Sequence, residues 1–369
     1  MQNKKLEGLA TERSKPCVTI SMITHQTHPE NAPDLLTLEA LLKEAKTRVL
    51  NEFAEEDVSE LLKNIRKIEK EFDADYLNYS LNSLHIFLSN RTKEVTKSMF
   101  KLLENTVQVG DRFALKPLIK DYNQTEEYYI LLISQAGGQL YHALNNTILG
   151  EISNDDFPFN ESLKEQKTNK EQHHKDPQEL TDPGRVENKI LEYLNVIDKA
   201  MVKMHRETGL PCVLVCTEHN YSRLKKIADV PAIYIGYTAV DYNDITLQAL
   251  ADAAWKVVDE VQEQRIADDI SEMREAVGHG LVFTDLSEIF RAAKEGKGDL
   301  LIVNENFHQA VKMNGELAFD LVNDSKEMGV IDDITNEIAW DVFSKNGRVV
   351  FTHQEEIKSI GDIALKVRY

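Results

Sequence analysis

The sequence lacks the features that mark membrane and secreted proteins. No apolar run approaches the roughly 18 residues of a membrane-spanning helix, and the opening MQNKKLEGLATERSKP has no apolar core like that of a secretory signal. Three cysteines in 369 residues are too few for a disulfide framework. Cys212 and Cys216 would lie about 13 Å apart on one predicted strand, beyond disulfide reach. These absences predict a protein of the reducing cytoplasm with no membrane partner.

Motifs of several common catalytic classes are also missing. The glycines of GHGLVF and EGKGDLLIV have the wrong spacing for a phosphate-binding loop, and no Gly-x-Ser-x-Gly elbow occurs. We therefore expect neither nucleotide-driven nor serine-hydrolase chemistry, and no cofactor.

The sequence has fewer basic than acidic residues. The chain carries 62 acidic and 43 basic residues, a formal net charge of −19. This charge opposes broad nonspecific binding to nucleic acid or to anionic membranes, and we expect no DNA partner. A local basic patch on one domain remains compatible with it. The 42% hydrophobic content is ordinary for a globular protein, and the length predicts two or three domains.

Residues 1–125 form the first predicted part. CVTISMIT is typical of a buried strand. Two amphipathic helices follow, for which Asp34 and Asp57 are the expected N-caps. SLHIFLSN predicts another strand, and the following segment predicts a turn at Gly110-Asp111 and a stop at Pro117.

Residues 126–262 form the second part. Predicted strands at Tyr128–Ser134 and Gln139–Leu144 flank Ala136-Gly137-Gly138, which is expected to be a tight hairpin turn. Residues 160–185 lack apolar periodicity and predict a mobile loop. A helix begins after Pro183-Gly184 and ends at Gly209. The near-continuous apolar strand LPCVLVCTE, followed by helix, strand and long helix, indicates an α/β domain.

Residues 263–369 form the third part, a small α/β/α layered domain. Helices are predicted at DLSEIFRAAKEGKG and DDITNEIAWDVFSKNG, and strands at DLLIVNEN, RVVFTHQ and GDIALKVRY. The expected fold class is therefore α/β, with three α/β domains.

The order of these parts resembles that of the bacterial relatives of the archaeal and eukaryotic class I release factors and Pelota. The segments that carry the resemblance are VTISMITHQTHPENAPDLLTLEALLKEA, VGDRFALKPLI ahead of YYILLIS, TLQALADAAWKVV, DLSEIFRAAKEGKGDLLIV ahead of GRVVFTHQ, and IALKVRY. The resemblance implies an RNase H-like middle domain and a C-terminal domain with the fold of a kink-turn-binding ribosomal protein. It also implies the ribosome, tRNA or rRNA as partner.

Gly137-Gly138-Gln139 spells the tripeptide with which release factors cleave peptidyl-tRNA. In that family the tripeptide lies on a long mobile loop ahead of a long helix. The corresponding place here is residues 160–185, which contain no Gly-Gly-Gln. A hairpin would instead fix the glycines at the rim of a sheet, with Gln139 heading the next strand. The resemblance thus predicts binding to the ribosome or to tRNA-like RNA without hydrolysis, of rescue or hibernation type, and no catalytic residue.

The sequence is also compatible with other functional classes. It leaves enzymatic activity undecided and favours a protein that is not an enzyme. Glu218, Asp241 and Asp244 follow predicted strands and could hold a divalent metal in a nuclease-like cluster. The simpler interpretation is that Asp244, and Asn220 beside Glu218, cap the N-termini of helices. A residual peptidyl-tRNA hydrolase activity is a related alternative. The weaker histidine-based candidates for a metal site are His25 with His28, and His173-His174 with Asp176. A protein-interaction module with no RNA partner is the third class.

Two local groups of bases are the candidate RNA contacts. YSRLKKIA places Tyr221 beside three bases on one helix, which suits contact with phosphate and a stacked base. An ordinary solvated helix face is the simpler interpretation. The full candidate set is Lys164, Lys167, Lys170, His173, His174, Lys175, Arg185, Arg223, Lys225 and Lys226.

Overall fold

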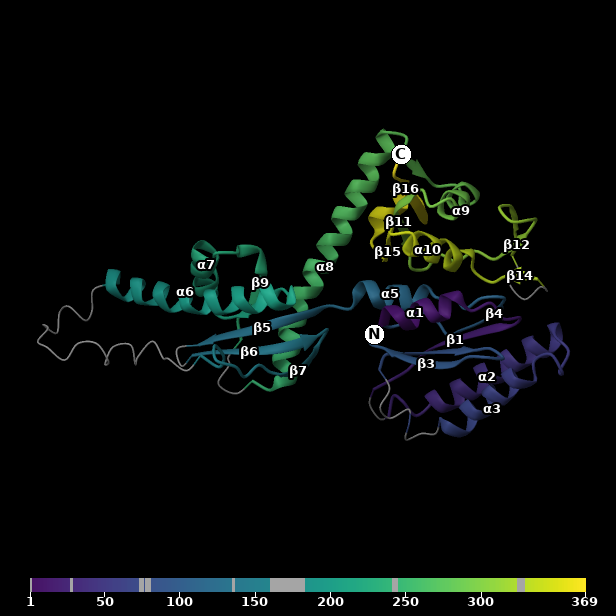
Figure 1. Ribbon diagram of the computed structural model, residues 1–369, viewed down its shortest axis with the longest axis horizontal. Helices are drawn as coiled ribbons and strands as arrows, with labels where there is room; N and C mark the ends of the chain where they lie inside the picture. Colours follow the sequence, from purple (N-terminus) through teal and green to yellow (C-terminus); the bar gives the residue numbers. More distant parts are fainter. Residues whose placement is uncertain are drawn as a thin grey trace, which may run out of the picture. The chain divides into compact units, whose positions relative to one another are not determined.

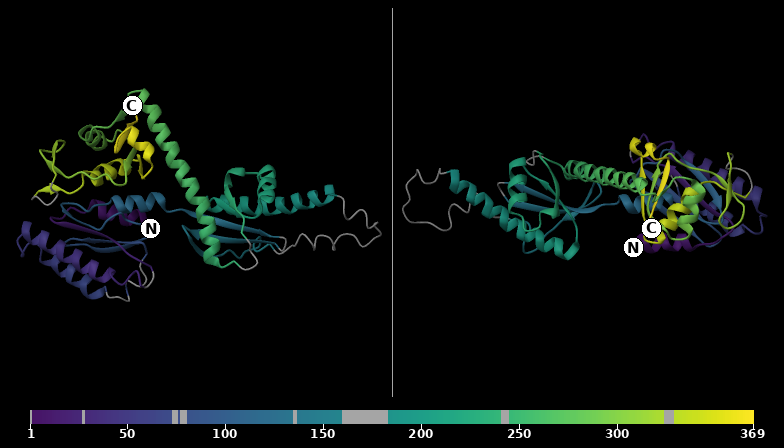
Figure 2. Two further views of the ribbon diagram at one scale, coloured as in Figure 1. Left: turned by 180° about the vertical axis from the view of Figure 1, so that it is seen from behind. Right: turned by 90° about the horizontal axis from the view of Figure 1, so that it is seen from above.

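The chain folds into two compact units in the computed structural model, which describes residues 2–26, 29–72, 76, 81–134, 137–159, 183–240, 245–323 and 329–369. Unit 1 comprises Met1–Gln124 and Ile266–Tyr369, and unit 2 comprises Thr125–Arg265. Helix α8 (Leu247–Gly278) crosses from unit 2 into unit 1. Figures 1 and 2 show the elements of both units. The mixed α/β class is as predicted, and the division into three domains remains a prediction.

The N-terminal segment of unit 1 is a four-stranded antiparallel sheet with helices on both faces. Its strand order is β3-β2-β1-β4. Helices α2 and α3 cover one face and α1 and α5 the other (Figure 1). The strands are β1 (Cys17–Ile23), β2 (Ser83–Leu88), β3 (Lys93–Ser98) and β4 (Thr106–Gly110). The helices are α1 (Gln2–Thr11), α2 (Asp34–Glu52), α3 (Ser59–Glu71) and α5 (Lys116–Gln124).

Three local predictions for this segment are wrong. The N-caps of α2 and α3 are Pro33 and Val58, which have no side-chain cap hydrogen bond. Asp34 lies inside the first turn of α2, and its buried carboxylate accepts hydrogen bonds from the backbone and ring nitrogens of His25, both at 2.8 Å. Pro117 does not stop a helix but is the second residue of α5, where a missing N–H costs nothing.

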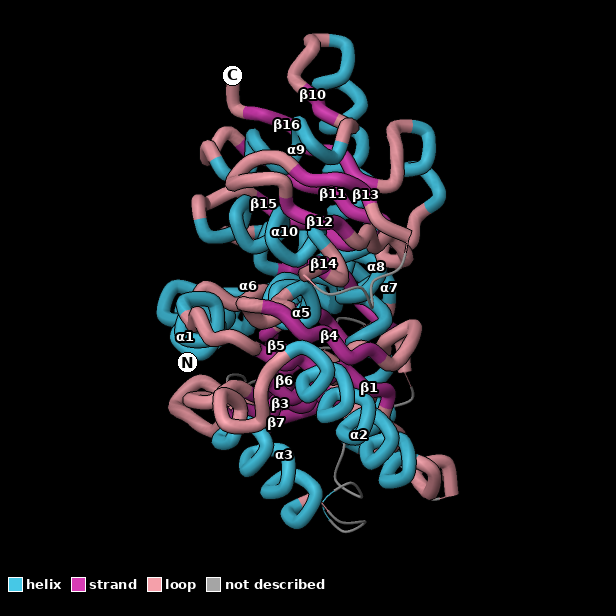
Figure 3. The backbone as a smooth tube through the Cα atoms, turned by 90° about the vertical axis from the view of Figure 1, so that its right-hand side faces the viewer, coloured by secondary structure: helices cyan, strands magenta, loops and turns pink. Residues whose placement is uncertain are grey.

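The C-terminal segment of unit 1 adds a second sheet, ordered β10-β16-β11-β15, and a small antiparallel sheet, ordered β13-β12-β14. Helices α9 and α10 pack with α1 and α5 in one hydrophobic core, so both segments of unit 1 share it. Figure 3 shows α10 beside α5. The elements are β10 (Val282–Phe283), α9 (Leu286–Lys294), β11 (Gly298–Asn304), β12 (Val311–Met313), β13 (Phe319–Leu321), β14 (Val330–Ile331), α10 (Ile334–Ser344), β15 (Arg348–Thr352), η4 (Glu355–Ser359) and β16 (Ile363–Val367).

Unit 2 is built on a five-stranded sheet ordered β7-β6-β5-β8-β9. Strands β5, β8 and β9 are parallel, whereas β6 and β7 run antiparallel to their neighbours. Helices α6 and α7 cover one face and α8 covers the other. The elements are β5 (Glu127–Ser134), β6 (Gly137–Leu144), β7 (Thr147–Glu151), α6 (Pro183–Thr208), β8 (Cys212–Val215), α7 (Glu218–Ile227), η3 (Pro231–Ile233) and β9 (Tyr234–Thr238).

Several predictions about unit 2 and the cysteines are confirmed. Helix α6 ends at Gly209, whose φ of +75° suits glycine and whose N–H donates to the His205 carbonyl at 2.7 Å. The three cysteines are free and buried, and burial raises the pKa of Cys17 and of Cys216 to about 12. Within the described ranges, no helix is long and apolar enough to cross a membrane.

Candidate functional site

The carboxyl ends of the three parallel strands of unit 2 meet at one edge of its sheet. Strand β5 ends at Ser134, directly beside the start of β6, and β8 leads into the N-terminus of α7. This edge therefore holds Gly137-Gly138-Gln139 and the N-terminus of α7, whereas Lys225, near the C-terminus of α7, donates to Tyr234 at the start of β9. Side chains at the carboxyl ends of parallel strands are well placed to contact a ligand, which makes this edge the first candidate site.

The glycines of the tripeptide do not form the turn that the sequence suggests. Strand β6 already begins at Gly137, which pairs with Ser134, and Gly138 pairs with Ile133. Gln139 is the third residue of β6 rather than its head and pairs with Leu132. The connection between the strands is residues 135–136, which lie outside the described residues. The predicted hairpin is present, but the predicted position of its turn is wrong.

Gly138 is held on its other side as well. Its N–H donates to the Phe159 carbonyl at 2.9 Å, and its carbonyl accepts from the Phe159 N–H at 2.8 Å. The exposed side chain of Gln139 lies 3.5 Å from Glu151 Oε1 on β7. The tripeptide is therefore a paired section of a sheet, in which backbone hydrogen bonds already fix Gly138.

The two glycines should respond differently to alanine. Gly137 has a φ of +145°, which strains any side chain, so Gly137→Ala should cost about 1–3 kcal/mol of unfolding free energy. A Cβ on Gly138 would meet Ile197 at 3.4 Å, an ordinary contact, so Gly138→Ala should stay within about 1 kcal/mol of wild type. The check is urea unfolding followed by Trp255 fluorescence in a Trp340→Phe background. Equal losses for both variants would contradict this geometry.

Helix α7 carries the described bases of the candidate set. Thr217 is its N-cap and accepts a hydrogen bond from the Asn220 N–H at 3.4 Å, so the predicted capping role of Asn220 is wrong. Arg223 Nε donates to Glu187 Oε1 at 2.8 Å, and a second guanidinium nitrogen pairs with Oε2. Lys225 donates to the carbonyls of Pro231 and Tyr234 at 2.9 and 3.1 Å. Intramolecular partners thus occupy both Arg223 and Lys225.

A basic stripe remains beside Glu187. We use this name for His219, Arg223 and Lys226, which occupy one face of α7 at helical spacing. The Arg223 hydrogen bonds, together with the nearby charges of Arg223, His219 and Lys226, lower the pKa of Glu187. His219 and Lys226 are exposed. One carboxylate thus faces three potential cations, and the surplus positive charge suits an anionic partner.

Tyr221 stacks on a second tyrosine instead of presenting a free ring. Its ring centroid is 4.6 Å from that of Tyr237 on β9, with an interplanar angle of 26°. Burial raises the pKa of Tyr221. Sequence reasoning placed Tyr221 near the bases but could not identify Tyr237, because the two residues meet only through the packing of α7 on the sheet.

The metal-site candidates and the loop bases fall mainly outside the described part of the chain. Glu218 is the exposed first residue of α7, whereas Asp241, Asp244 and His28 lie outside the described residues. So do Lys164, Lys167, Lys170, His173, His174, Lys175 and Asp176, and Arg185 is placed only as a backbone position in α6. Among the described residues, no three His, Cys, Asp or Glu side chains are grouped closely enough to hold a metal ion.

Comparison with known families finds a match for part of the chain. Residues 127–297 match the model of the bacterial archaeo-eukaryotic release factor family 3. This part of the chain, a little under half of it, is therefore similar to the bacterial relatives of the archaeo-eukaryotic release factors. The matched residues cover the sheet of unit 2, α8, and the first part of the C-terminal segment. No curated protein sequence matches the chain.

Solved structures show distant similarity to this chain. Pelota in a model of ribosome-bound archaeal Pelota and ABCE1 is 16% identical over 75% of this chain and 72% of its own, with a TM-score of 0.41. Archaeoglobus fulgidus Pelota is 15% identical over 78% and 79% of the two chains, with a TM-score of 0.38. The archaeal termination factor aRF1 is 15% identical over 100% and 97%, with a TM-score of 0.25.

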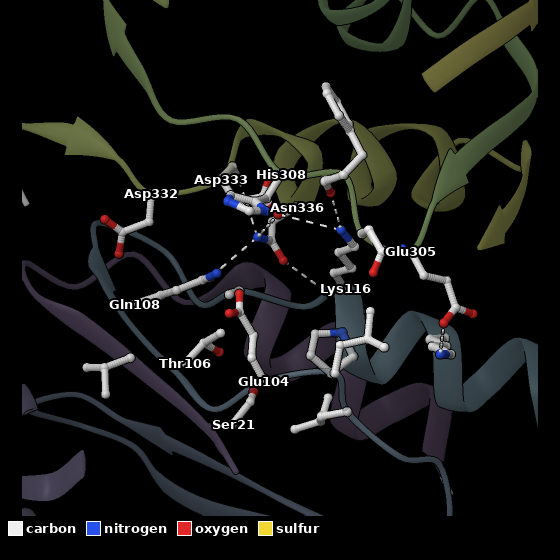
Figure 4. A pocket seen from close by; sticks show the side chains of 18 of the residues that line it. Ser21, Glu104, Thr106, Gln108, Lys116, Glu305, His308, Asp332, Asp333 and Asn336 are labelled. Carbon is white, nitrogen blue, oxygen red and sulfur yellow. Dashed lines mark hydrogen bonds and ion pairs between the residues drawn. The ribbon is translucent and has the colours of Figure 1, made fainter. Parts of the chain in front are cut away.

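A second candidate site is a cavity of about 500 Å³ in unit 1. Both segments of the unit line it, and Figure 4 shows the side chains that face it. Lys116 of α5 donates to the Phe307 carbonyl at 2.8 Å, and Asn336 of α10 accepts from the Lys116 N–H at 3.0 Å. These partners are about 200 residues apart in sequence, so no local motif predicts the site.

Proposed function

We propose that this release-factor relative is a cytoplasmic protein that binds the ribosome or tRNA-like RNA and does not cleave peptidyl-tRNA. One observation carries the proposal: Gly137-Gly138-Gln139 is hydrogen-bonded within a sheet, not displayed on a loop. The absence of Gly-Gly-Gln from residues 160–185 of the sequence supports it. A rescue or hibernation role fits a factor that occupies the ribosome without hydrolysis.

The chemistry of the tripeptide depends on backbone freedom. Glycines serve such a site because the chain can approach a substrate closely and adopt unusual conformations. The Gly138 N–H and carbonyl are both committed to Phe159, and Gln139 is paired across the strand with Leu132. To reach an ester bond, the tripeptide would have to break this pairing. That cost supports a non-catalytic role for the three residues.

The strand arrangement supports the finer fold assignment that we propose. Three antiparallel strands (β7, β6, β5) followed by two strands parallel to β5 suit an RNase H-like sheet in unit 2. The parallel pair β11 and β15 with α9 and α10 suits a C-terminal α/β/α domain. We retain three domains, 1–125, 126–262 and 263–369, as the proposed division.

The basic stripe is the described part of the proposed RNA contact. Lys226 and His219 are exposed, and no hydrogen bond or ion pair joins Lys226 to another residue in the described part of the chain. Glu187 holds Arg223 against α6 and so positions it at the same face. We propose that phosphate groups meet Lys226 here, beside the pair that Arg223 forms with Glu187, while the loop bases Lys164, Lys167, Lys170 and Lys175 extend the contact.

Co-sedimentation with ribosomes over a salt series tests these contacts. Lys226→Ala should weaken binding and reduce the slope of log affinity against log salt by about 1, because one phosphate contact is lost. Joint replacement of the four loop lysines by alanine should reduce the slope further. Lys256→Ala, an exposed lysine of α8 on the opposite face of the sheet, is the matched control and should leave the slope unchanged.

Other outcomes would favour the alternative functions. Divalent-metal-dependent RNA cleavage that disappears in Glu218→Gln would establish the nuclease alternative. Failure to co-sediment at low salt, including with ribosomes from starved cells, would favour a protein-interaction module. An equal loss of binding for Lys226→Ala and Lys256→Ala would remove the basic stripe from the interface.

A further inference from the structure

We propose that the unit 1 cavity binds an aliphatic diamine or polyamine. This inference is independent of the proposed function, because it concerns a different unit and a ligand of opposite charge to RNA. The cavity has a volume of about 500 Å³, within the range of small-molecule sites. Its walls come from β1, α2, the 101–104 loop, β4 and α5 of the N-terminal segment, and from α10, β15 and the loops after β11 and before α10 of the C-terminal segment.

Most of the cations in the wall are already neutralised. Arg48 makes a two-pronged contact with Asp332 at 2.8 and 2.9 Å. Lys120 lies 2.9 Å from Glu305. These pairs hold the wall in place and leave their positive charges unavailable, so an anionic ligand would have to displace a carboxylate from each.

Lys116 is also paired with groups inside the protein. Its ammonium group lies 3.7 Å from Asp333 and donates to the Phe307 carbonyl at 2.8 Å. Asp333 in turn caps α10 through the Thr335 N–H at 3.0 Å. Three of the four cationic side chains that line the cavity are thus paired inside the protein.

The charged side chains of the cavity wall that have no partner among the described residues are mainly negative. In the described part of the chain, no hydrogen bond or ion pair occupies the carboxylates of Glu44 and Glu104 or the ammonium group of Lys101. Figure 4 shows Glu104 pointing into the cavity, toward Gln108 and Asn336. Two free carboxylates against one exposed lysine favour a ligand that carries positive charge at more than one point.

The rest of the lining suits an aliphatic stem. Leu103 is 65% exposed at the cavity, and Pro117 and Phe307 add apolar surface. Methylene groups gain free energy when they cover such surface while charged ends stay hydrated or paired. A chain of methylenes with terminal ammonium groups has this combination of apolar stem and cationic ends. Inorganic cations lack the stem, and phosphates have the wrong charge.

Binding should also stabilise unit 1, because the ligand would touch both of its segments. A ligand that binds only the folded state raises the unfolding midpoint by mass action. The readout is Trp340 fluorescence in a Trp255→Phe background, since Trp340 lies in α10 of unit 1. Spermidine is expected to raise the midpoint of unit 1, and the stabilisation should grow with the logarithm of one plus the ratio of its concentration to its dissociation constant.

Isothermal titration of the full chain with spermidine at low salt is the test. Glu104→Gln and Glu44→Gln should each weaken binding about three- to fivefold, the effect of one partly exposed ion pair. Lys101→Ala should tighten binding, because it removes the unpaired positive charge. Glu39→Gln, an exposed carboxylate of α2 that does not line the cavity, changes net charge equally and should have no effect.

Three results would overturn the proposal. Spermidine that does not bind at low salt would exclude the site. An equal loss in Glu39→Gln and Glu104→Gln would show general attraction to an acidic surface. Equal binding of 1,5-diaminopentane and 1,5-pentanediol would show that the apolar stem alone is recognised. Circular dichroism of each variant guards against loss of fold, and these glutamine substitutions are at exposed positions.

Discussion

Replacement of Asp198 by alanine should lower the free energy of unfolding of unit 2 by about 3–5 kcal/mol, the cost of breaking a buried charged hydrogen-bond network. Asp198 on α6 has no exposed surface. It accepts hydrogen bonds from the Tyr234 hydroxyl at 2.7 Å and from the Asp229 N–H at 2.9 Å. Without the carboxylate, the buried Tyr234 hydroxyl and the part-buried Asp229 N–H both lose their acceptor, and α6 loses its tie to the chain between α7 and β9.

Two further variants separate the Tyr234 hydrogen bond from the rest of the Asp198 network and provide an exposed control. Tyr234→Phe removes one donor but leaves the carboxylate bound to the Asp229 N–H, so it should cost about 1–2 kcal/mol. Asp252→Ala, an exposed carboxylate on α8, should cost less than about 0.5 kcal/mol. Urea unfolding is followed by Trp255 fluorescence in a Trp340→Phe background, because each unit contains one of the two tryptophans. A loss below about 1 kcal/mol in Asp198→Ala would contradict this role.

Acidification should destabilise unit 1 through His85 by on the order of 3 kcal/mol between pH 6.5 and 4. His85 is 1% exposed, and its ring nitrogens lie 2.9 Å from Ser21 Oγ and 3.4 Å from Ser83 Oγ. Burial lowers the pKa of His85 from 6.5 to about 4. The unfolded chain therefore binds the proton first, so this stability is complete above pH 6.5 and is lost as the pH falls towards 4.

Asp121 should have the opposite effect to His85 and stabilise unit 1 as the pH falls. Burial raises its pKa from 3.8 to about 6, against the hydrogen bond from Ser98 and the charge of Lys120. The folded state therefore holds the proton more tightly, and this contribution is complete below pH 3.8 and lost as the pH rises through 6. The wild-type profile between pH 4 and 6 combines both slopes, which partly cancel.

The two slopes can be resolved with single variants. In His85→Asn, acidification should lower the unfolding free energy less than in wild type. In Asp121→Asn it should lower the unfolding free energy more, because the stabilising protonation of Asp121 is removed. The quantity compared is the slope of unfolding free energy against pH, because either substitution also changes the absolute stability. Trp340 fluorescence in a Trp255→Phe background reports on unit 1. A pH slope that is unchanged in His85→Asn would rule out His85 as the titrating group.

Local patterns predicted the regular core elements because their periodicity is a direct consequence of burial. Strand β1, buried except at its last residue, and the apolar stripe of α6 before Gly209 are examples. Strand β3, with the sequence KEVTKS, escaped prediction because an edge strand with polar faces lacks an apolar alternation. The short strands β12, β13 and β14 have too few residues to show any period.

The tripeptide shows where a strong local signal fails. Gly-Gly is typical of hairpin turns, yet here Gly138 sits inside β6, paired with Phe159 on one side and facing Ile197. The pairing of Gly138 with Phe159 and its contact with Ile197 arise only when α6 and the segment after β7 pack against β6, so no local pattern reports them. The same limit applies to Arg48 and Asp332, which pair in the cavity wall only through tertiary structure.

Peptide release and ribosome binding, measured in the same samples, test the proposed function most directly. Ribosomes that carry labelled peptidyl-tRNA are incubated with the chain at low salt, sedimented, and assayed for bound protein and free peptide. Wild type and Gln139→Ala should both co-sediment and leave the ester bond intact. Peptide released by wild type but not by Gln139→Ala would contradict ribosome occupancy without hydrolysis and would restore Gly137-Gly138-Gln139 as a catalytic tripeptide.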